Sequence, residues 1–170
     1  GDSRATPTRQ GSTMELKALE VARWAHGGDA VATVQHGPLT GMVVFIEGGV
    51  PGDVVNVRVS RQKKRWAKAS ITSFVSQSEH RREVPCRVQR SCGGCPWMPG
   101  NRTVQARSRL AILRGEAKKR LGWSDAEAEQ RVRLAPEAGG EFSYRMRLRL
   151  RYEINPEGEC VLGFREARSR

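Results

Sequence analysis

The chain has 170 residues, with 30 Lys and Arg against 18 Asp and Glu, and a formal net charge of +12 at pH 7. This length allows one ordinary domain or two small ones, and this charge indicates a polyanionic partner, for which nucleic acid fits better than an anionic membrane. The sequence holds no apolar run near the roughly 18 residues of a membrane span, and no signal-peptide stretch near its N-terminus, so we expect a cytoplasmic monomer without a membrane partner.

Residues 1–14 show no apolar periodicity, and we expect them to form a disordered leader. Short apolar runs separated by turn signals follow from residue 15 to residue 75. The expected strands are Leu16–Trp24, Ala30–Val34, Met42–Ile46, Val54–Val59 and Trp66–Phe74. Five short strands at this spacing predict a small β-barrel. The glycine-rich stretch at 48–52 contains Pro51 and precedes no helical pattern, so it predicts a turn rather than a methyl-donor loop.

Residues 76–100 form a polar segment in which Cys86, Cys92 and Cys95 follow a C-x5-C-x2-C spacing. In a reducing cytoplasm, such a cluster of thiols indicates metal ligands rather than disulfides. Zinc and iron–sulfur clusters both bind thiolates, and this spacing does not choose between them. Cys160 lies far from the cluster, and we interpret it as a strand residue, since free Cys commonly packs as a small hydrophobe.

The remaining segment predicts one long helix and a β-hairpin. Apolar residues recur at helical spacing from Thr103 to Leu121, which predicts an amphipathic helix ending near Gly122. Residues 124–140 read as a linker with a short acidic helical piece. From Tyr144 to Tyr152 apolar residues alternate with arginines, which predicts a strand with one basic face. A turn at 155–158 leads to a second apolar run at 161–164, so the two strands are expected to pair as a hairpin.

Basic residues with an aromatic residue among them are the natural RNA-binding candidates on a barrel of this size. The candidates on the barrel are Arg61, Lys63, Lys64, Arg65, Trp66 and Lys68, and those on the hairpin are Arg145, Arg147, Arg149 and Arg151. A solvated surface is the alternative interpretation for each basic residue. We interpret Trp24 and Trp97 as packing residues, with Trp97 covering the cysteine segment.

Several motifs, in order along the chain, carry a resemblance to one family. These are Val44-Phe45-Ile46 with Gly49-Val50-Pro51-Gly52-Asp53, then Ser78-Glu79-His80-Arg81, Pro85-Cys86, Cys92-Gly93-Gly94-Cys95, Tyr144-Arg145 and Leu162-Gly163-Phe164-Arg165. Together they resemble the N-terminal part of the TRAM-domain, iron–sulfur-containing RNA (uracil-5-)-methyltransferases, which depend on S-adenosylmethionine and act on rRNA or tRNA. The resemblance covers nearly everything from residue 15 to residue 170. One departure is Met98, where the family usually has Gln.

The resemblance implies a mainly β architecture. We expect an OB-like TRAM barrel at 15–75 and an iron–sulfur loop at 76–100, with the start of a truncated central α+β domain, one helix and a hairpin, at 101–170. It implies a four-iron four-sulfur cluster on Cys86, Cys92 and Cys95, with the fourth ligand past Arg170. It also places S-adenosylmethionine and the catalytic residues in a Rossmann-like domain that this chain lacks.

We therefore expect an enzyme by family whose fragment is inactive alone and assign no catalytic residue. The alternatives are a stand-alone zinc-binding nucleic-acid module and a ribosome-associated structural protein, the latter of which would share the charge but would not need the cysteines.

Overall fold

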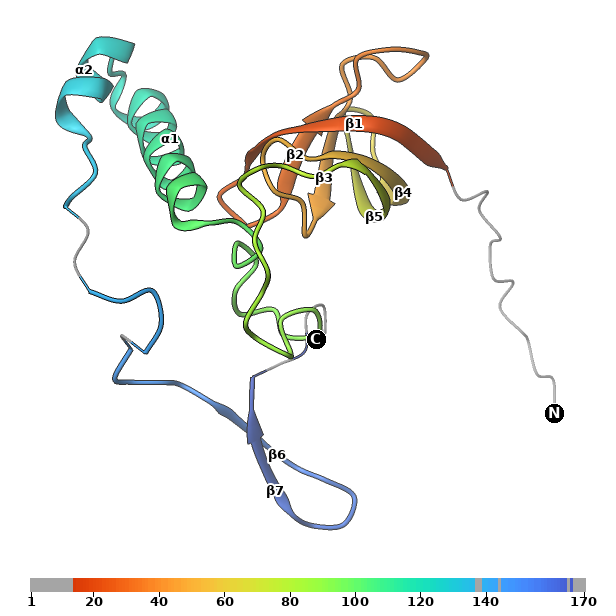
Figure 1. Cartoon of the computed structure of the whole chain (residues 1–170), viewed down its shortest axis with the longest axis vertical. Helices are drawn as coiled ribbons and strands as arrows, with labels where there is room; N and C mark the ends of the chain where they lie inside the picture. The colour runs from red at the N-terminus through yellow and green to blue at the C-terminus, as the bar shows by residue number, and fades with distance from the viewer. Residues whose placement is uncertain (1–13, 137–138, 144, 165, 167–170) are drawn as a thin grey trace, which may run out of the picture.

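The computed structural model describes residues 14–136, 139–143, 145–164 and 166. The predicted leader therefore lies outside the described residues, except for Met14, as do Tyr144 and Arg165 of the predicted hairpin. Figure 1 shows a barrel joined to two helices on one side, with a long loop and a hairpin below them.

The barrel consists of five strands: β1 (Glu15–Trp24), β2 (Ala30–Thr33), β3 (Val43–Glu47), β4 (Val54–Gln62) and β5 (Trp66–Ser76). They close in the order β1-β2-β3-β5-β4, and β1 pairs with β4. All neighbours are antiparallel except β3 and β5, which run parallel. The five predicted strands and the predicted OB-like barrel are confirmed.

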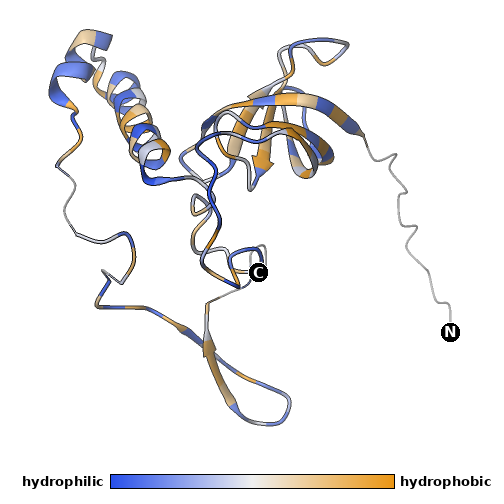
Figure 2. Cartoon of the chain, in the orientation of Figure 1, coloured by the Kyte–Doolittle hydropathy of each residue, from blue (hydrophilic) through white to orange (hydrophobic). Residues whose placement is uncertain are grey.

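The alternation of buried and exposed residues along the strands accounts for the hydrophobic core of the barrel. On β5, Ala67 and Ala69 are buried while Lys68 and Ser70 are exposed, and on β4, Val55 and Val57 are fully buried. Since successive strand residues point to opposite faces, one face of the closed sheet lines the core and the other is left for solvent or a ligand. Figure 2 shows apolar residues alternating with polar ones around the barrel.

Two helices follow the loop: α1 (Arg102–Leu121) and α2 (Asp125–Arg131). Asn101 caps α1 by accepting from the Val104 amide at 3.0 Å, and Gly122, with a φ of 69°, ends α1 in the left-handed conformation that glycine allows. A capping box between Ser124 and Glu127 begins α2, and hydrogen bonds from the Ser124 backbone and hydroxyl lower the pKa of the Glu127 carboxyl.

The helix predicted at 103–121 and the short acidic helix are thus confirmed. Val104 is the buried residue of α1 among those described, and Leu113 and Leu121 remain about 60% exposed (59% and 61%). Leu110, Ile112 and Ala117 are half-buried, and α2 packs against α1. Neither described helix is long and apolar enough to cross a bilayer.

The hairpin is shorter than predicted. Its strands are β6 (Arg151–Ile154) and β7 (Cys160–Gly163), paired from Arg151 opposite Gly163 to Ile154 opposite Cys160. Residues 145–150 form no strand, because β7 ends at Gly163 and leaves them without a neighbour for hydrogen bonding. The predicted strand from Tyr144 to Tyr152, with its single basic face, is therefore wrong over its described residues before Arg151.

A glycine at the start of α1 tests how tightly helix and barrel pack. A methyl group added at Gly100 would collide with the Trp24 ring and lie 2.8 Å from Cγ1 of Val104, whereas Gly115 in α1 has nothing within 4 Å. We expect Gly100→Ala to lower the free energy of unfolding by about 1–3 kcal/mol through overpacking. As a matched control, Gly115→Ala should raise it by up to about 1 kcal/mol through helix propensity. Urea denaturation measures both, and equal stabilities would contradict the packing described here.

Candidate nucleic-acid interface and cysteine loop

A buried ion pair joins the barrel to the loop that follows it. Asp53, fully buried in the turn before β4, accepts two hydrogen bonds from Arg81, at 3.1 Å from Nε to Oδ1 and 2.6 Å from Nη2 to Oδ2. The amides of Val50 and Ser78 donate to the same carboxylate at 2.7 and 2.9 Å. Four donors therefore compensate a charge that burial alone would strongly destabilise.

The glycine of the same turn allows the loop to approach closely. A Cβ added at Gly52, whose φ is +92°, would lie 2.8 Å from Oγ of Ser78. That hydroxyl donates to the Pro51 carbonyl at 2.6 Å, and Nη2 of Arg81 donates to the Gly48 carbonyl at 2.9 Å. The Pro-Gly-Asp turn and the Ser-x2-Arg segment are thus held together by hydrogen bonds.

An aromatic contact fixes the far end of the same loop. Trp97 stacks on the buried Trp24 with ring centroids 4.8 Å apart and an interplanar angle of 10°. Backbone hydrogen bonds from Arg82 to Pro99 and from Asn101 to His80, both 2.8 Å, join the two ends of the loop to each other. The packing roles assigned to the two tryptophans agree with this geometry, and the loop is held at both ends.

The three clustered cysteines lie between these anchors. Cys86 and Cys92 are half-buried and Cys95 is exposed, and all are free thiols. Cys86 lines one cavity while Cys92 lines another. Among the described residues, no three His, Cys, Asp or Glu side chains come close enough to hold a metal ion, so the structure does not gather the predicted ligands into one centre.

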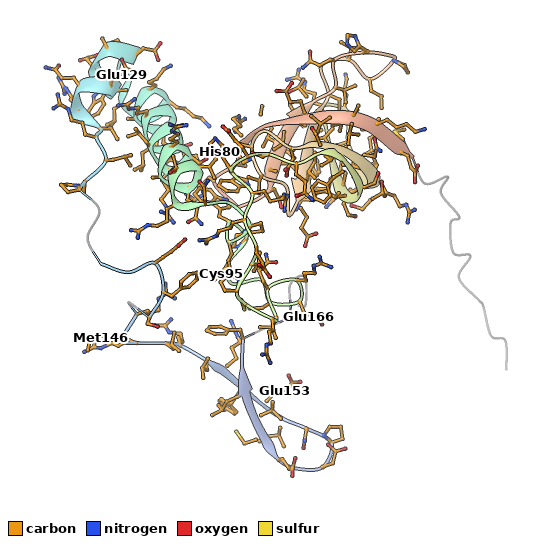
Figure 3. All side chains as sticks on the ribbon, in the orientation of Figure 1. His80, Cys95, Glu129, Met146, Glu153 and Glu166 are labelled. Carbon is orange, nitrogen blue, oxygen red and sulfur yellow. The ribbon has the colours of Figure 1, made fainter. Side chains whose placement is uncertain are left out.

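The chain returns to this loop after the hairpin. Glu166 forms an isolated antiparallel bridge with Cys92, so this residue lies beside the cysteine loop. Figure 3 shows Glu166 and Cys95 on the same side of the barrel, below it in this view. Cys160 is exposed on β7, as predicted for a strand residue outside the cluster, although it is not packed.

The predicted basic residues of the barrel lie on β4, on β5 and in the turn between them, and Arg61 contacts the ring of Trp66. Trp66 is half-buried at the start of β5, with the edge of Phe45 against it at 6.1 Å and the guanidinium of Arg61 above it at 5.7 Å. Arg61 lies opposite Lys68 in the β4–β5 register, and Lys63, Lys64 and Arg65 form the exposed turn between these strands. Lys68 pairs with Asp29 at 3.4 Å. We call the outer surface formed by Phe45, Arg61, Lys63, Lys64, Arg65, Trp66 and Lys68 the Trp66 face.

The hairpin arginines are not organised in this way. Arg145, Arg147 and Arg149 lie on the irregular segment before β6, and only Arg151 belongs to a strand. All four are exposed. The structure therefore brings six of the ten predicted RNA-binding residues together on the barrel and leaves the other four without a common face.

Asp53 and Arg81 were not predicted as site residues. Both appeared in the sequence only as members of motifs. One sequence signal for this pair was available. Asp53 stands directly before the apolar residues of β4, where a carboxylate is buried and needs a partner, and the loop after β5 contains an arginine.

The fold defines a class of protein: an OB-like barrel, with a basic surface beside Trp66, joined to a cysteine-bearing loop. The TRAM domain family matches residues 7–72. The matched family shows that the chain contains a TRAM domain, and the relatives that resemble it over most of its length are named as RNA methyltransferases.

The relatives agree over most of the chain. It is 32% identical to a 23S rRNA (uracil(1939)-C(5))-methyltransferase of Shewanella sediminis over 98% of its length, and 31% identical to that of Halomonas elongata over 97%. It is also 31% identical to an uncharacterised RNA methyltransferase of Corynebacterium glutamicum over 91%. The chain spans about a third of these relatives, 36%, 32% and 35% respectively.

One solved structure, a Pyrococcus abyssi tRNA (uracil-54, C5)-methyltransferase with S-adenosyl-L-homocysteine, is 25% identical. The similarity covers 63% of this chain and 22% of that one, with a TM-score of 0.35, which is too low to establish a common overall fold.

Removing either partner of the Asp53–Arg81 pair should be costly. We expect Asp53→Asn and Arg81→Met each to lower the free energy of unfolding by about 3–5 kcal/mol, since each leaves a buried polar group unpaired. The double variant should lose less than the sum. The matched control is Arg58→Met, which breaks the exposed pair with Glu15 and should cost less than about 1 kcal/mol. Denaturation with a double-mutant cycle measures these terms, and additive losses would contradict the coupling.

Proposed function

We propose that this chain is an RNA-binding part of an RNA uracil-C5-methyltransferase, and that the Trp66 face holds single-stranded RNA. The observation that carries the proposal is the aromatic ring of Trp66 flanked by exposed cations. Proteins bind single strands by stacking bases on aromatic rings while basic side chains follow the phosphates. Among the described residues no acidic side chain pairs with Arg61, Lys63, Lys64 or Arg65, so these charges remain available to phosphate.

The names of the relatives support a proposal for the kind of RNA. Those from Shewanella and Halomonas are named as methyltransferases of 23S rRNA, and the Pyrococcus protein as one of tRNA. We therefore propose a uridine of rRNA or tRNA as the target, reached by flipping the base out of its stack. The reaction requires a cysteine thiolate to add to the base, a methyl donor and a proton acceptor. We assign none of these roles to the described residues, and propose that S-adenosylmethionine binds outside them.

The arginines at 145–151 are proposed as a secondary, purely electrostatic contact. They are exposed, but their segment does not fix them in one geometry. Such residues contribute to the affinity for a polyanion without selecting its sequence.

We also propose that Cys86, Cys92 and Cys95 hold a four-iron four-sulfur cluster. Their chemistry fits, because three thiols on one anchored loop are the donors that such clusters require, although the structure does not assemble them. The cluster would act as a cross-link within the loop. The bridge between Cys92 and Glu166 supports a fourth ligand from the segment after β7. Zinc remains the alternative for the same thiols.

The Trp66 face can be tested with paired tryptophan substitutions. We expect Trp66→Ala to raise the Kd for single-stranded RNA roughly 5- to 150-fold, since stacking is worth about 1–3 kcal/mol per base. Trp123→Ala is the matched control, because Trp123 also lies under an arginine, Arg131 at 4.9 Å, but outside the barrel. Fluorescence anisotropy measures both affinities. Equal effects of the two substitutions would refute the proposed face.

The metal can be tested without any activity assay. We expect protein purified anaerobically to contain iron and sulfide and to absorb broadly in the visible range, and Cys92→Ser to abolish this absorption. Cys160→Ser, the matched control, should retain it, since Cys160 is remote in sequence and lies on the hairpin. A colourless protein containing stoichiometric zinc would favour the zinc alternative, and a folded protein without either metal would refute both.

A further inference from the structure

A basic cavity lies where β5 runs into the cysteine loop. Its volume is about 590 Å³, within the range of roughly 300–1,000 Å³ typical of ligand sites. Gln77 and Arg81, which follow β5, form part of its lining. Cys86, Arg87, Gln89 and Arg90 of the cysteine loop form another part, so the cavity adjoins the proposed cluster site. The lining of this cavity is thus mostly polar and cationic, and it shares no residue with the Trp66 face.

Two of its arginines are already paired and two are not. Arg81 is bound to Asp53, and Arg82, which also lines the cavity, is paired with Glu141. Arg87 and Arg90 are exposed and form no ion pair with any residue that the structure describes. Glu83 is the acidic residue on the lining, and it too is exposed. The paired arginines fix the wall of the cavity, while Arg87 and Arg90 keep positive charge available for a ligand.

We propose that this cavity binds a phosphodiester of the RNA backbone through Arg87 and Arg90. A guanidinium offers two parallel donors to phosphate oxygens, and the side-chain amides of Gln77 and Gln89 supply further donors on the same lining. The chemistry recognises phosphate and not a base, because the cavity wall offers no aromatic side chain for stacking. The proposal rests on the proposed function and adds a second contact point to it.

The cavity and the Trp66 face lie at opposite ends of one strand. β5 begins at Trp66 and ends at Ser76, immediately before Gln77. Eleven residues at about 3.3 Å each separate the two points by at most about 35 Å of strand. One RNA strand that follows β5 would therefore contact both, provided that it is long enough. Single-strand sites on such barrels cover about 4–16 nucleotides.

The test compares RNA of two lengths on the anaerobically purified protein. We expect Arg87→Ala with Arg90→Ala to lower the slope of log affinity against log salt by about 0.7 for an oligonucleotide of about 16 nucleotides, the value for one phosphate contact on a single strand. An oligonucleotide of about 4 nucleotides, seated at Trp66, should be unaffected. Inorganic phosphate should weaken binding of the longer oligonucleotide to the unaltered protein more than chloride of equal ionic strength does, and no more than chloride in the Arg87→Ala, Arg90→Ala variant.

The matched control removes two charges elsewhere. Arg107→Ala with Lys119→Ala on α1 changes the net charge equally, and should leave the slope within error of the unaltered protein. If this control lowers the slope as much as the cavity variant does, the lower slope results from the change in net charge of the whole protein, and the inference fails. Unaltered circular dichroism and unfolding midpoint confirm that the variants fold. If neither Trp66→Ala nor the cavity variant weakens RNA binding, the proposed function fails. If Trp66→Ala weakens RNA binding and the cavity variant does not, only the proposal for the cavity is overturned.

Discussion

The salt bridge between Asp53 and Arg81 is the interaction on which the arrangement of barrel and loop depends. The carboxylate belongs to the turn before β4 and the guanidinium to the first residues after β5, so a single pair ties two separate parts of the chain. Its burial makes it sensitive to geometry: the pair is favourable only because the Val50 and Ser78 amides complete the hydrogen bonding of the carboxylate. The position of the cysteine loop is thereby set by the barrel rather than by the loop itself.

The two anchors of the loop have different physical characters. The Asp53–Arg81 end is polar and directional, whereas the Trp24–Trp97 end is an apolar stack that tolerates small rotations. Between them the cysteines have few contacts of their own. The barrel interior, by contrast, is packed with small and branched side chains, and its outer surface is free to carry Trp66 and its cations. The packed core and the proposed binding surface thus lie on opposite faces of the same strands.

Much of this fold could be predicted from the sequence because it follows from local rules. Alternation and turn residues located all five barrel strands, and the helix at 102–121 ends at the glycine that marked it. The strand predicted at 144–152 does not form over most of its length. Alternation shows only that a segment could pair in a sheet, and its partner β7 provides just four residues to pair with. The Asp53–Arg81 pair depends on contacts between residues 28 positions apart, which no local pattern encodes. The three cysteines have a recognisable spacing in the sequence, but among the described residues the structure does not gather them into one group.

The strand pairing that closes the barrel also determines the order in which parts of the chain can fold. The first strand must wait for the fourth, since Glu15 lies opposite Arg58, and the parallel pairing of β3 needs β5 as well. Such distant pairings form slowly compared with helices. On a growing polypeptide, however, β5 is complete at Ser76, before Cys86 has been synthesised. Because domains fold as units from the N-terminus during synthesis, the barrel can close before the thiols emerge from the ribosome. The cysteines would then meet a finished docking surface rather than a collapsing chain, which protects them from mispairing.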